Sequence, residues 1–595
     1  MSMRLLFPRT VPPLAAVLMG LGVSAPPAFA AALPPGCTES AGEISEVPLP
    51  EDVSREGTIY TCTQGLSQDW TVGGGNTQII ITNVPGAPGI AAGATLKYTG
   101  NGVIAVTVPR RNGVSPSGMR GDAINGTVDI ATSASYYRVD GFGGGETGLL
   151  ETGTAGAGGR GCTITAPGKR GWIGLHGGGD TGRGAAPGSD HCTITTGGWA
   201  DFTGGSGSNT LPGGAGAPGV VGGTVTARVL LADGGRGGSP AYDTDPSTGR
   251  NRSDGGPGGA GVLDATVTVT KTALLTGGAG GNGYEGRGNW APTMPGGVGG
   301  QGGAGISGST LTTTGSPGED YEIRVIGGEG GWGGPGGPSG YQGAGPGQGG
   351  RGGDGGAGST GTTLRGPAQG AGSVKATGGK PGPGGAGGGR GGSDSSQPFT
   401  PGSPGKAGGP GQGNAGTIIV AGTGNQITTD VNGGRIDAGD GGSNTITVTT
   451  NNGSVNAGSS LGNTCRITTD NKPEATINCV GAPVPTPTPT PMPTPTPTQT
   501  STPTPKPVPT QTPTSVAPSP ARTATAVPTQ ATVKPAPTCA PGTHDARCRQ
   551  EAKGQLADTG LGSGDLTAAA LALSSIGLGT LTLLAVRRHR TRNRA

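Results

Sequence analysis

Residues able to carry acid–base chemistry are sparse in this 595-residue chain, which contains four histidines. Two of them, His176 and His191, lie in its glycine-rich body near Asp180 and Asp190. Hydrolysis by general acid–base catalysis needs clustered carboxylates with a well-placed histidine, and no paired-aspartate signature accompanies these two. We therefore expect surface histidines on glycine-rich turns, no catalytic residues and no enzymatic activity. A carbohydrate-active surface enzyme is the alternative.

Oxygen ligands for a cation occur at two glycine–aspartate turns, residues 352–358 and 437–442. Calcium prefers carboxylate and carbonyl oxygens, but the first turn lacks the apolar residue that follows aspartate in calcium-binding nonapeptide repeats. We expect no cofactor and no metal, with weak calcium binding at these turns as the alternative. A phosphate-binding loop is excluded because no Gly-Lys-Ser/Thr sequence follows the glycines.

The eight cysteines fall into four sequence-local pairs with no C-x-x-C spacing. An even count in an exported chain predicts disulfides, and nearest-neighbour pairing is the simplest hypothesis. The predicted pairs are Cys37 with Cys62, Cys162 with Cys192, Cys465 with Cys479, and Cys539 with Cys548.

The two ends of the chain carry export signals. Residues 1–30 combine Arg4 and Arg9, a short apolar stretch and Ala28-Phe29-Ala30, which predicts a signal peptide cleaved after Ala30. At the other end, residues 556–595 contain a five-residue motif, an uncharged stretch at 566–586 long enough to span a bilayer, and five arginines that should stay cytoplasmic. The motif is Leu556, Ala557, Asp558, Thr559 and Gly560.

This order of motif, span and basic tail resembles the cell-wall sorting signal of Gram-positive surface proteins. The resemblance implies that a sortase attacks the carbonyl of Thr559, releases Gly560 onward and joins the chain to peptidoglycan. Ala557 stands where proline is commoner, which is similar to the variant used by sortases of high-GC actinobacteria. The expected location is therefore the cell wall, with sortase and peptidoglycan as partners and membrane contact only through the span before sorting.

Composition excludes an ordinary globular domain, because 133 residues are glycine and only 3% are aromatic. A net charge of +3 gives no reason to expect a nucleic-acid partner. Residues 482–538 form a Pro/Thr tract that predicts an extended, disordered stalk across the wall. A small cysteine loop, residues 539–555, separates this stalk from the sorting signal.

Residues 31–481 alternate strand-like runs with glycine at every third position, most regularly over 220–420. We expect a mainly β fold, a parallel β-helix or solenoid, with glycine-rich polyproline II hairpins inserted between its strands. The strand-like runs are 77–82, 102–107, 224–230, 265–270, 321–326 and 417–420. The glycine texture resembles the PGRS regions of mycobacterial proteins.

Two recurrences support stacked coils. Cys162-Thr-Ile-Thr returns as Cys192-Thr-Ile-Thr, each followed by Gly-Trp, so the two cysteines should lie on neighbouring coils. Residues 435–439 and 454–458 repeat with a strand-like run between them. The segments around Cys37 and Cys465 should then cap the ends of the solenoid.

The aromatic residues of the glycine hairpins are the best candidates for ligand contact, because rings on polar loops can stack on sugars or anchor proteins. An alternative is that each ring covers its own hairpin. These residues are Tyr242, Tyr284, Trp290, Trp332, Tyr341 and Phe399. We expect an adhesin-like display protein that contacts host or environmental glycans or proteins. Another alternative is an ice- or mineral-binding surface. A regular threonine array on one face would favour it, and the run at 445–449 permits such an array.

Overall fold

The computed structural model describes the chain in sixteen segments, all within the compact unit Met1–Thr490. They are residues 32–44, 54–82, 87–109, 121–144, 155–179, 184–209, 212–240, 254–286, 295–315, 319–339, 345–367, 370–389, 400–439, 441–458, 462–470 and 477–478. The predicted leader, stalk, cysteine loop and sorting signal lie outside them. Within these segments no helix is long and apolar enough to cross a membrane.

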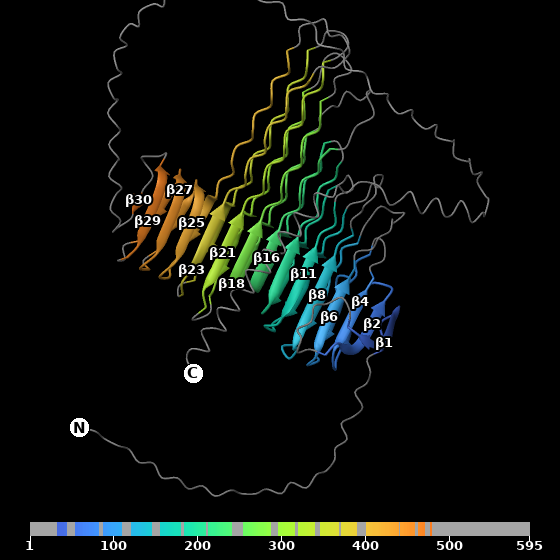
Figure 1. The fold of residues 1–595 in the computed structure, drawn as a ribbon. Helices are drawn as coiled ribbons and strands as arrows, with labels where there is room; N and C mark the ends of the chain where they lie inside the picture. Colours follow the sequence, from blue (N-terminus) through green and yellow to red (C-terminus); the bar gives the residue numbers. More distant parts are fainter. Residues whose placement is uncertain are drawn as a thin grey trace, which may run out of the picture. The chain divides into compact units, whose positions relative to one another are not determined.

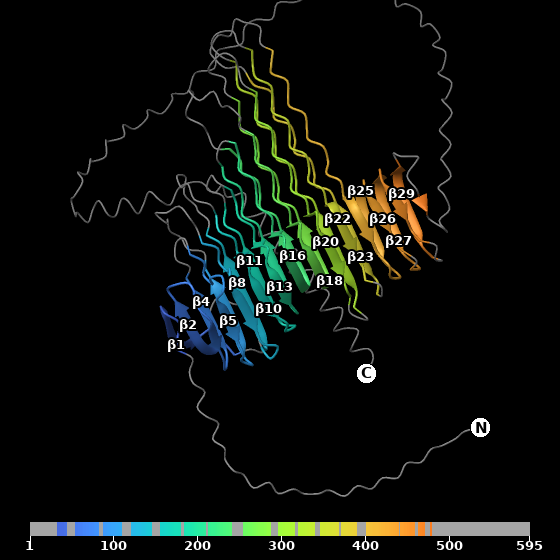
Figure 2. The same ribbon diagram turned by 180° about the vertical axis from the view of Figure 1, so that it is seen from behind.

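The described residues are mainly β, and their thirty strands join one continuous sheet (Figures 1 and 2). Every pairing between named strands is parallel except β1 (Cys37–Glu43) with β2 (Glu56–Cys62). Apart from the strands at the ends, each strand pairs with strands one coil before and one coil after it, so the pairings form three ladders. This stacking is what a parallel β-helix requires.

Ladder 1 contains the longest strands. Its members are β2, β4 (Thr77–Ile81), β6 (Val103–Val108), β8 (Tyr136–Phe142), β11 (Gly171–His176), β14 (Trp199–Thr203), the second halves of β16 (Thr224–Asp233) and β18 (Thr266–Thr276), β21 (Tyr321–Ile326), β23 (Gly372–Thr377), β25 (Gln426–Asn432), β27 (Thr445–Asn451) and β29 (Thr464–Asp470).

Ladders 2 and 3 are built from shorter strands. Ladder 2 holds β3 (Trp70–Val72), β5 (Thr95–Tyr98), β7 (Thr127–Ile130), β10 (Thr163–Ala166), β13 (Thr193–Thr196), the first halves of β16 and β18, β20 (Thr310–Thr313), β22 (Ser359–Arg365), β24 (Asn414–Ile419), β26 (Arg435–Asp437), β28 (Ser454–Asn456) and β30 (Ile477–Asn478). Ladder 3 holds β9 (Gly159–Arg160), β12 (Ser189–Asp190), β15 (Val220–Val221), β17 (Val262–Leu263) and β19 (Ile306–Ser307), then the first residues of β22 and β24.

One coil passes through ladder 3, ladder 2 and ladder 1, then leaves the sheet as a glycine-rich arm and returns to ladder 3. The predicted recurrence is confirmed, because β10 and β13 pair in parallel from Thr163 with Thr193 and Cys162 forms a disulfide with Cys192. Each of the six predicted strand runs coincides with a strand, and four of them extend one residue beyond it. The repeats at 435 and 454 also pair in parallel, as β26 and β28.

The core is a column of aliphatic side chains inside the ladders. Alternation puts every second residue of a strand inward, as in β13, whose isoleucine is buried while Thr193 and Thr195 are exposed. In-register stacking aligns these inward residues, and burial of each contributes about 1.5–3 kcal/mol. The ladder 2 column is Leu96, Val128, Ile164, Ile194, Val225, Val267, Leu311, Leu364, Ile418, Ile436 and Val455.

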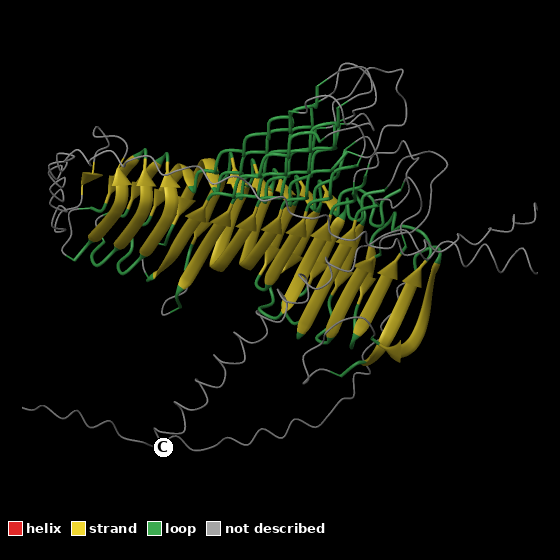
Figure 3. Cartoon of the chain, turned by 45° about the horizontal axis from the view of Figure 1, so that its top comes forward, coloured by secondary structure: helices red, strands yellow, loops and turns green. Residues whose placement is uncertain are grey.

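The arms form a regular lattice beside the strands (Figure 3). Each arm repeats a three-residue unit, commonly Gly-Gly-x. The first residue donates its N–H to the same arm of the following coil, as Gly299 does to Arg351. The second donates to an antiparallel arm, as Gly300 does to Gly281 at 2.7 Å. The third residue is exposed or half-buried, as Gln301 is.

The last arm pair, residues 378–389 and 400–413, departs from this rule at the first position of several units. The preceding arm pair donates to it through Gly349, Gly352, Gly355 and Gly358. In the last pair, the first residues of the units would donate to a following arm pair. Four of these residues are proline, which has no N–H to donate: Pro381, Pro401, Pro404 and Pro410. The Gly378 N–H is instead bonded to Asp430 Oδ2 at 2.9 Å.

Both ends of the stack are modified. At the first end β1 covers β2 in antiparallel register, and Cys37 is joined to Cys62 as predicted. Near the other end, buried asparagines eighteen or nineteen residues apart stack in rows. Asn432 donates to Asn451 at 2.9 Å and accepts from Asn414 at 2.8 Å. Cys465 is disulfide-bonded, and its predicted partner Cys479 lies outside the described residues.

Candidate functional site

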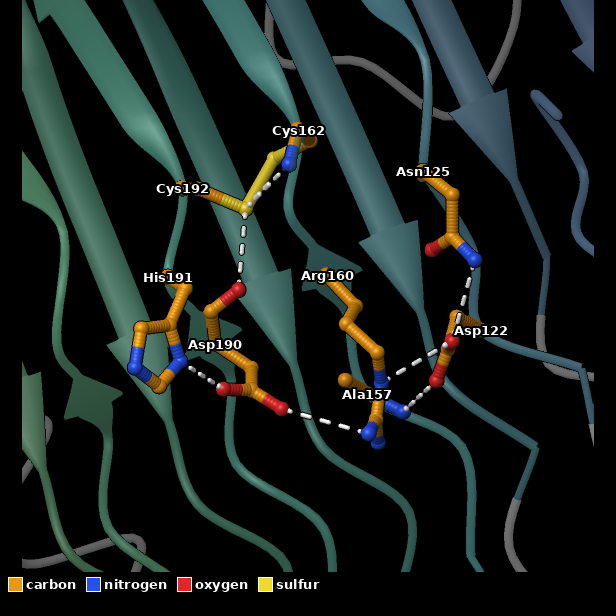
Figure 4. Close-up of polar contacts among 8 residues, drawn as sticks. All are labelled: Asp122, Asn125, Ala157, Arg160, Cys162, Asp190, His191 and Cys192. Carbon is orange, nitrogen blue, oxygen red and sulfur yellow. Dashed lines mark hydrogen bonds and ion pairs between the residues drawn. A yellow bond between two sulfur atoms is a disulfide. The ribbon is translucent and has the colours of Figure 1, made fainter. Parts of the chain in front are cut away.

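A polar cluster joins the ladder 3 turns of three consecutive coils (Figure 4). Arg160 reaches Asp122 on one side, with Nε 3.1 Å from Oδ2, and Asp190 on the other, with Nη1 3.4 Å from Oδ2. Asp122 also accepts from the Ala157 N–H at 2.7 Å and from Asn125 at 3.1 Å. Both oxygens of the Asp122 carboxylate therefore have partners, and the cluster stabilises the turns.

His191 lies at the exposed end of this cluster. Its Nδ1 is 2.6 Å from Asp190 Oδ1, and its side chain is 69% exposed. Its φ of 53° places it in the left-handed turn position that glycine holds in neighbouring coils, as Gly222 does with φ 60°. A histidine oriented by a carboxylate can activate a nucleophile, but the neighbouring Cys192 sulfur is in a disulfide. The expectation of a surface histidine on a glycine-rich turn holds for His191.

His176 does not lie on a turn, contrary to expectation, but is the last residue of β11, half-buried on the outer face of ladder 1. The structure therefore does not bring the two histidines together. Its ring stacks on Phe142 with centroids 4.7 Å apart, and Trp172 stacks on Trp199 at 5.8 Å. Asp180, which the sequence places near His176, lies outside the described residues. Stacked rings on adjacent coils follow from parallel register, because identical positions recur along a ladder.

Two carboxylates flank Gly174 between these ring pairs. Asp140 is paired with Gly174 on the preceding coil and Asp201 on the following one. Burial, with the negative charges of Asp233 and then Asp140 adding to it, raises the pKa of Asp201 to about 6. Asp140 accepts from Arg138 Nε at 2.5 Å. Its other oxygen has no hydrogen-bond partner in the described part of the chain and no solvent contact.

A carboxyl group with a raised pKa next to a second carboxyl group is an arrangement that general acid–base pairs use. Here the two groups lie two strand spacings apart, about 9–10 Å between their Cα atoms. Because the unpaired Asp140 oxygen is closed to solvent, a substrate on this face cannot contact it. The sequence did not indicate this strip of carboxylates on either side of Gly174, because each carboxylate is a single aspartate in a different coil.

In the two turns considered for calcium, Asp354 and Asp437 are bonded internally, and Asp440 lies outside the described residues. Asp354 Oδ1 accepts from Arg351 and from the Gly409 N–H at 2.6 Å. Asp437 Oδ1 accepts from the Gly439 N–H at 3.0 Å, and Asp437 Oδ2 pairs with Arg435. The described segments contain no group of three or more histidine, cysteine, aspartate or glutamate side chains that could hold a metal ion.

Two of the six candidate aromatic residues are described, and both lie within the arms. Trp332 occupies the third position of its unit and is 64% exposed. Its backbone N–H donates to Asn282 Oδ1 at 3.1 Å. Tyr284 is half-buried on the equivalent arm of the preceding coil. Trp332 therefore presents an open ring, whereas Tyr242, Trp290, Tyr341 and Phe399 lie outside the described residues.

The most regular surface is the outer face of ladder 2, which we call the threonine face. Threonine occupies one outward position in nine consecutive coils. These residues are Thr95, Thr127, Thr163, Thr193, Thr224, Thr266, Thr310, Thr363 and Thr417. Two residues further along the strand, a second column holds Thr165, Thr195, Thr226, Thr268 and Thr312.

Charged residues bound the second column, with Asp129 next to Thr165 and Arg365 next to Thr312. The ten threonines of the five central coils are exposed or half-buried, and their strands β10, β13, β16, β18 and β20 lie side by side in Figure 2. The run at 445–449 is different, because Thr445 is flanked by Gln426 and Thr464. The threonine array therefore lies in an earlier part of the stack.

The residues of the predicted sorting motif, 556–560, lie outside the described segments. No protein-family model matches the chain, and it shows no match to a curated protein or a solved structure.

Proposed function

We propose that this chain is an exported, wall-anchored surface protein of a Gram-positive bacterium. A parallel β-solenoid bearing polyproline II glycine hairpins is displayed on a Pro/Thr stalk, and a sortase attaches the chain to peptidoglycan through Thr559. Its role is display and contact, with no turnover of substrate.

The observation that carries this proposal is the order of elements in residues 556–595. A Leu-Ala-x-Thr-Gly motif precedes an uncharged span, and arginines follow. The span and arginines would hold the chain in the membrane while the transpeptidase acts. Two disulfides, Cys37–Cys62 and Cys162–Cys192, favour an oxidising compartment outside the cytosol.

Replacement of Thr559 tests the anchor. We expect Thr559→Ala to leave export intact and to abolish covalent linkage to the wall, because the scissile carbonyl would no longer be recognised. Cells are extracted with hot detergent, and the protein that remains in the wall fraction is released with a muramidase and quantified.

Asp558→Asn is the matched control, because position 558 is the variable residue of the motif, and this variant should stay wall-linked. Detergent-resistant Thr559→Ala protein would refute sortase attachment. Equal loss of linkage in both variants would show that the motif acts in another way.

A further inference from the structure

We propose that the threonine face binds the surface of ice through the ten threonines of its five central coils. These belong to the Thr-x-Thr segments of β10, β13, β16, β18 and β20. The inference concerns the stack alone and does not depend on how the chain is anchored.

The threonines form a two-dimensional mesh with constant spacings. Adjacent strands of a sheet lie about 4.7–4.9 Å apart, and residues i and i+2 of a strand about 6.6–6.8 Å apart. Pairing in this region keeps Thr163, Thr193 and Thr224 in one row and Thr165, Thr195 and Thr226 in the next. The threonine face thus repeats identical hydroxyl and methyl groups in two directions.

The absence of charged and aromatic side chains from the two threonine columns indicates which kind of surface they bind. No charged side chain interrupts its two columns between Asp129 and Arg365, so it lacks the charges that an ionic mineral lattice would demand. No aromatic ring occupies an outward position in these columns, so it lacks the stacking platform of a polysaccharide site. Water ordered as ice is uncharged, flat, periodic and rich in hydrogen-bond partners.

Rigidity lets the face act as a template. Threonine is β-branched and has a restricted χ1 angle, and the strands that carry it are held by neighbours on both sides and by the aliphatic column beneath. Little side-chain freedom is then lost on binding. One hydroxyl–water bond contributes little in net terms because it replaces a bond to liquid water. Ten sites that engage together can hold a growing crystal surface.

The test measures ice growth with the full chain and two lysine variants of one strand. Thr268→Lys places a long cation within the threonine face. Thr272→Lys is the matched control, because Thr272 is an equally half-buried threonine of β18 that belongs to ladder 1. Thermal hysteresis and ice recrystallisation are measured at equal concentrations, and circular dichroism checks the fold of each variant.

We expect the parent chain and Thr272→Lys to show the same hysteresis and inhibition of recrystallisation, and Thr268→Lys to lose at least half of both. A folded parent chain without either effect would overturn the proposal. So would equal losses in the two variants, or adsorption of the parent chain to calcium carbonate or chitin crystals without any effect on ice.

Discussion

A single methyl group inside the glycine lattice should be costly, and Gly300 is the position where the cost can be worked out. A Cβ at Gly300 would lie 2.6 Å from the carbonyl carbon of Gly256 and closer still to its oxygen. Backbone strain adds nothing, because Gly300 is not among the residues with positive φ. The two arms would have to separate by about 1.5 Å to restore ordinary van der Waals contact with that oxygen.

That separation affects at least four hydrogen bonds. Gly255 and Gly258 donate directly from one arm to the other, to Val298 and Gln301, each at 2.8 Å. Gly300 donates to Gly281 at 2.7 Å, and Gly281 donates to the displaced Gly256 carbonyl at 2.8 Å. A buried backbone group left without its partner costs about 1–3 kcal/mol. The gain of about 0.4–1 kcal/mol from a stiffer unfolded chain offsets only part of this cost. Gly300→Ala should therefore destabilise the arms by roughly 2–5 kcal/mol.

Hydrogen exchange followed by mass spectrometry measures this effect where it occurs. Amides of residues 277–286 and 295–305 should exchange about 30-fold to several thousand-fold faster in Gly300→Ala, whereas those of the ladder strand at 266–276 should change little. Gln301→Ala alters an exposed neighbour and serves as the control. Unchanged arm protection in Gly300→Ala, or equal loss in both variants, would refute the steric argument.

Two further predictions concern buried polar groups. Because the pKa of Asp201 is raised to about 6, its ionisation opposes folding, so the parent chain should lose stability as pH rises from about 4 to above 6, by at most about 3 kcal/mol. Asp201→Asn should remove most of that loss in denaturation series across this range, and an unchanged pH profile would contradict it. Asn432→Ala should cost about 2–5 kcal/mol, because Asn414 and Asn451 each lose a buried partner. Chemical denaturation should show this cost, whereas Gln426→Ala, exposed on the same strand, should have little effect.

Much of the fold was predictable because it is encoded by short sequence repeats. The Cys-Thr-Ile-Thr recurrence placed Cys162 and Cys192 on neighbouring coils, and a glycine at every third residue predicted antiparallel arms. These features need only local pattern and a period. The sequence also predicted an exposed histidine at the turn of His191.

The surface sites were harder to predict because they depend on the register with which neighbouring coils pair. Thr163 and Thr312 belong to one array only because five coils, separated by arms of different lengths, pair without a shift along ladder 2. The strip that holds Asp140 and Asp201 depends in the same way on which residue faces Gly174. Sequence reasoning located a threonine run at 445–449, where the neighbouring coil presents Gln426 and breaks the pattern.

The prolines of the last arm pair lie at the edge where the glycine lattice ends. Any arm that ends the lattice with free N–H groups would be a template for an arm from another molecule, the same hazard that an open strand edge presents. Pro381, Pro401, Pro404 and Pro410 remove four of those donors. Coils could be duplicated or lost in the interior during evolution without losing this terminator. The N–H groups of Gly384, Gly387 and Ala407 remain at this edge, so the prolines interrupt the template, whatever the number of coils that precede it.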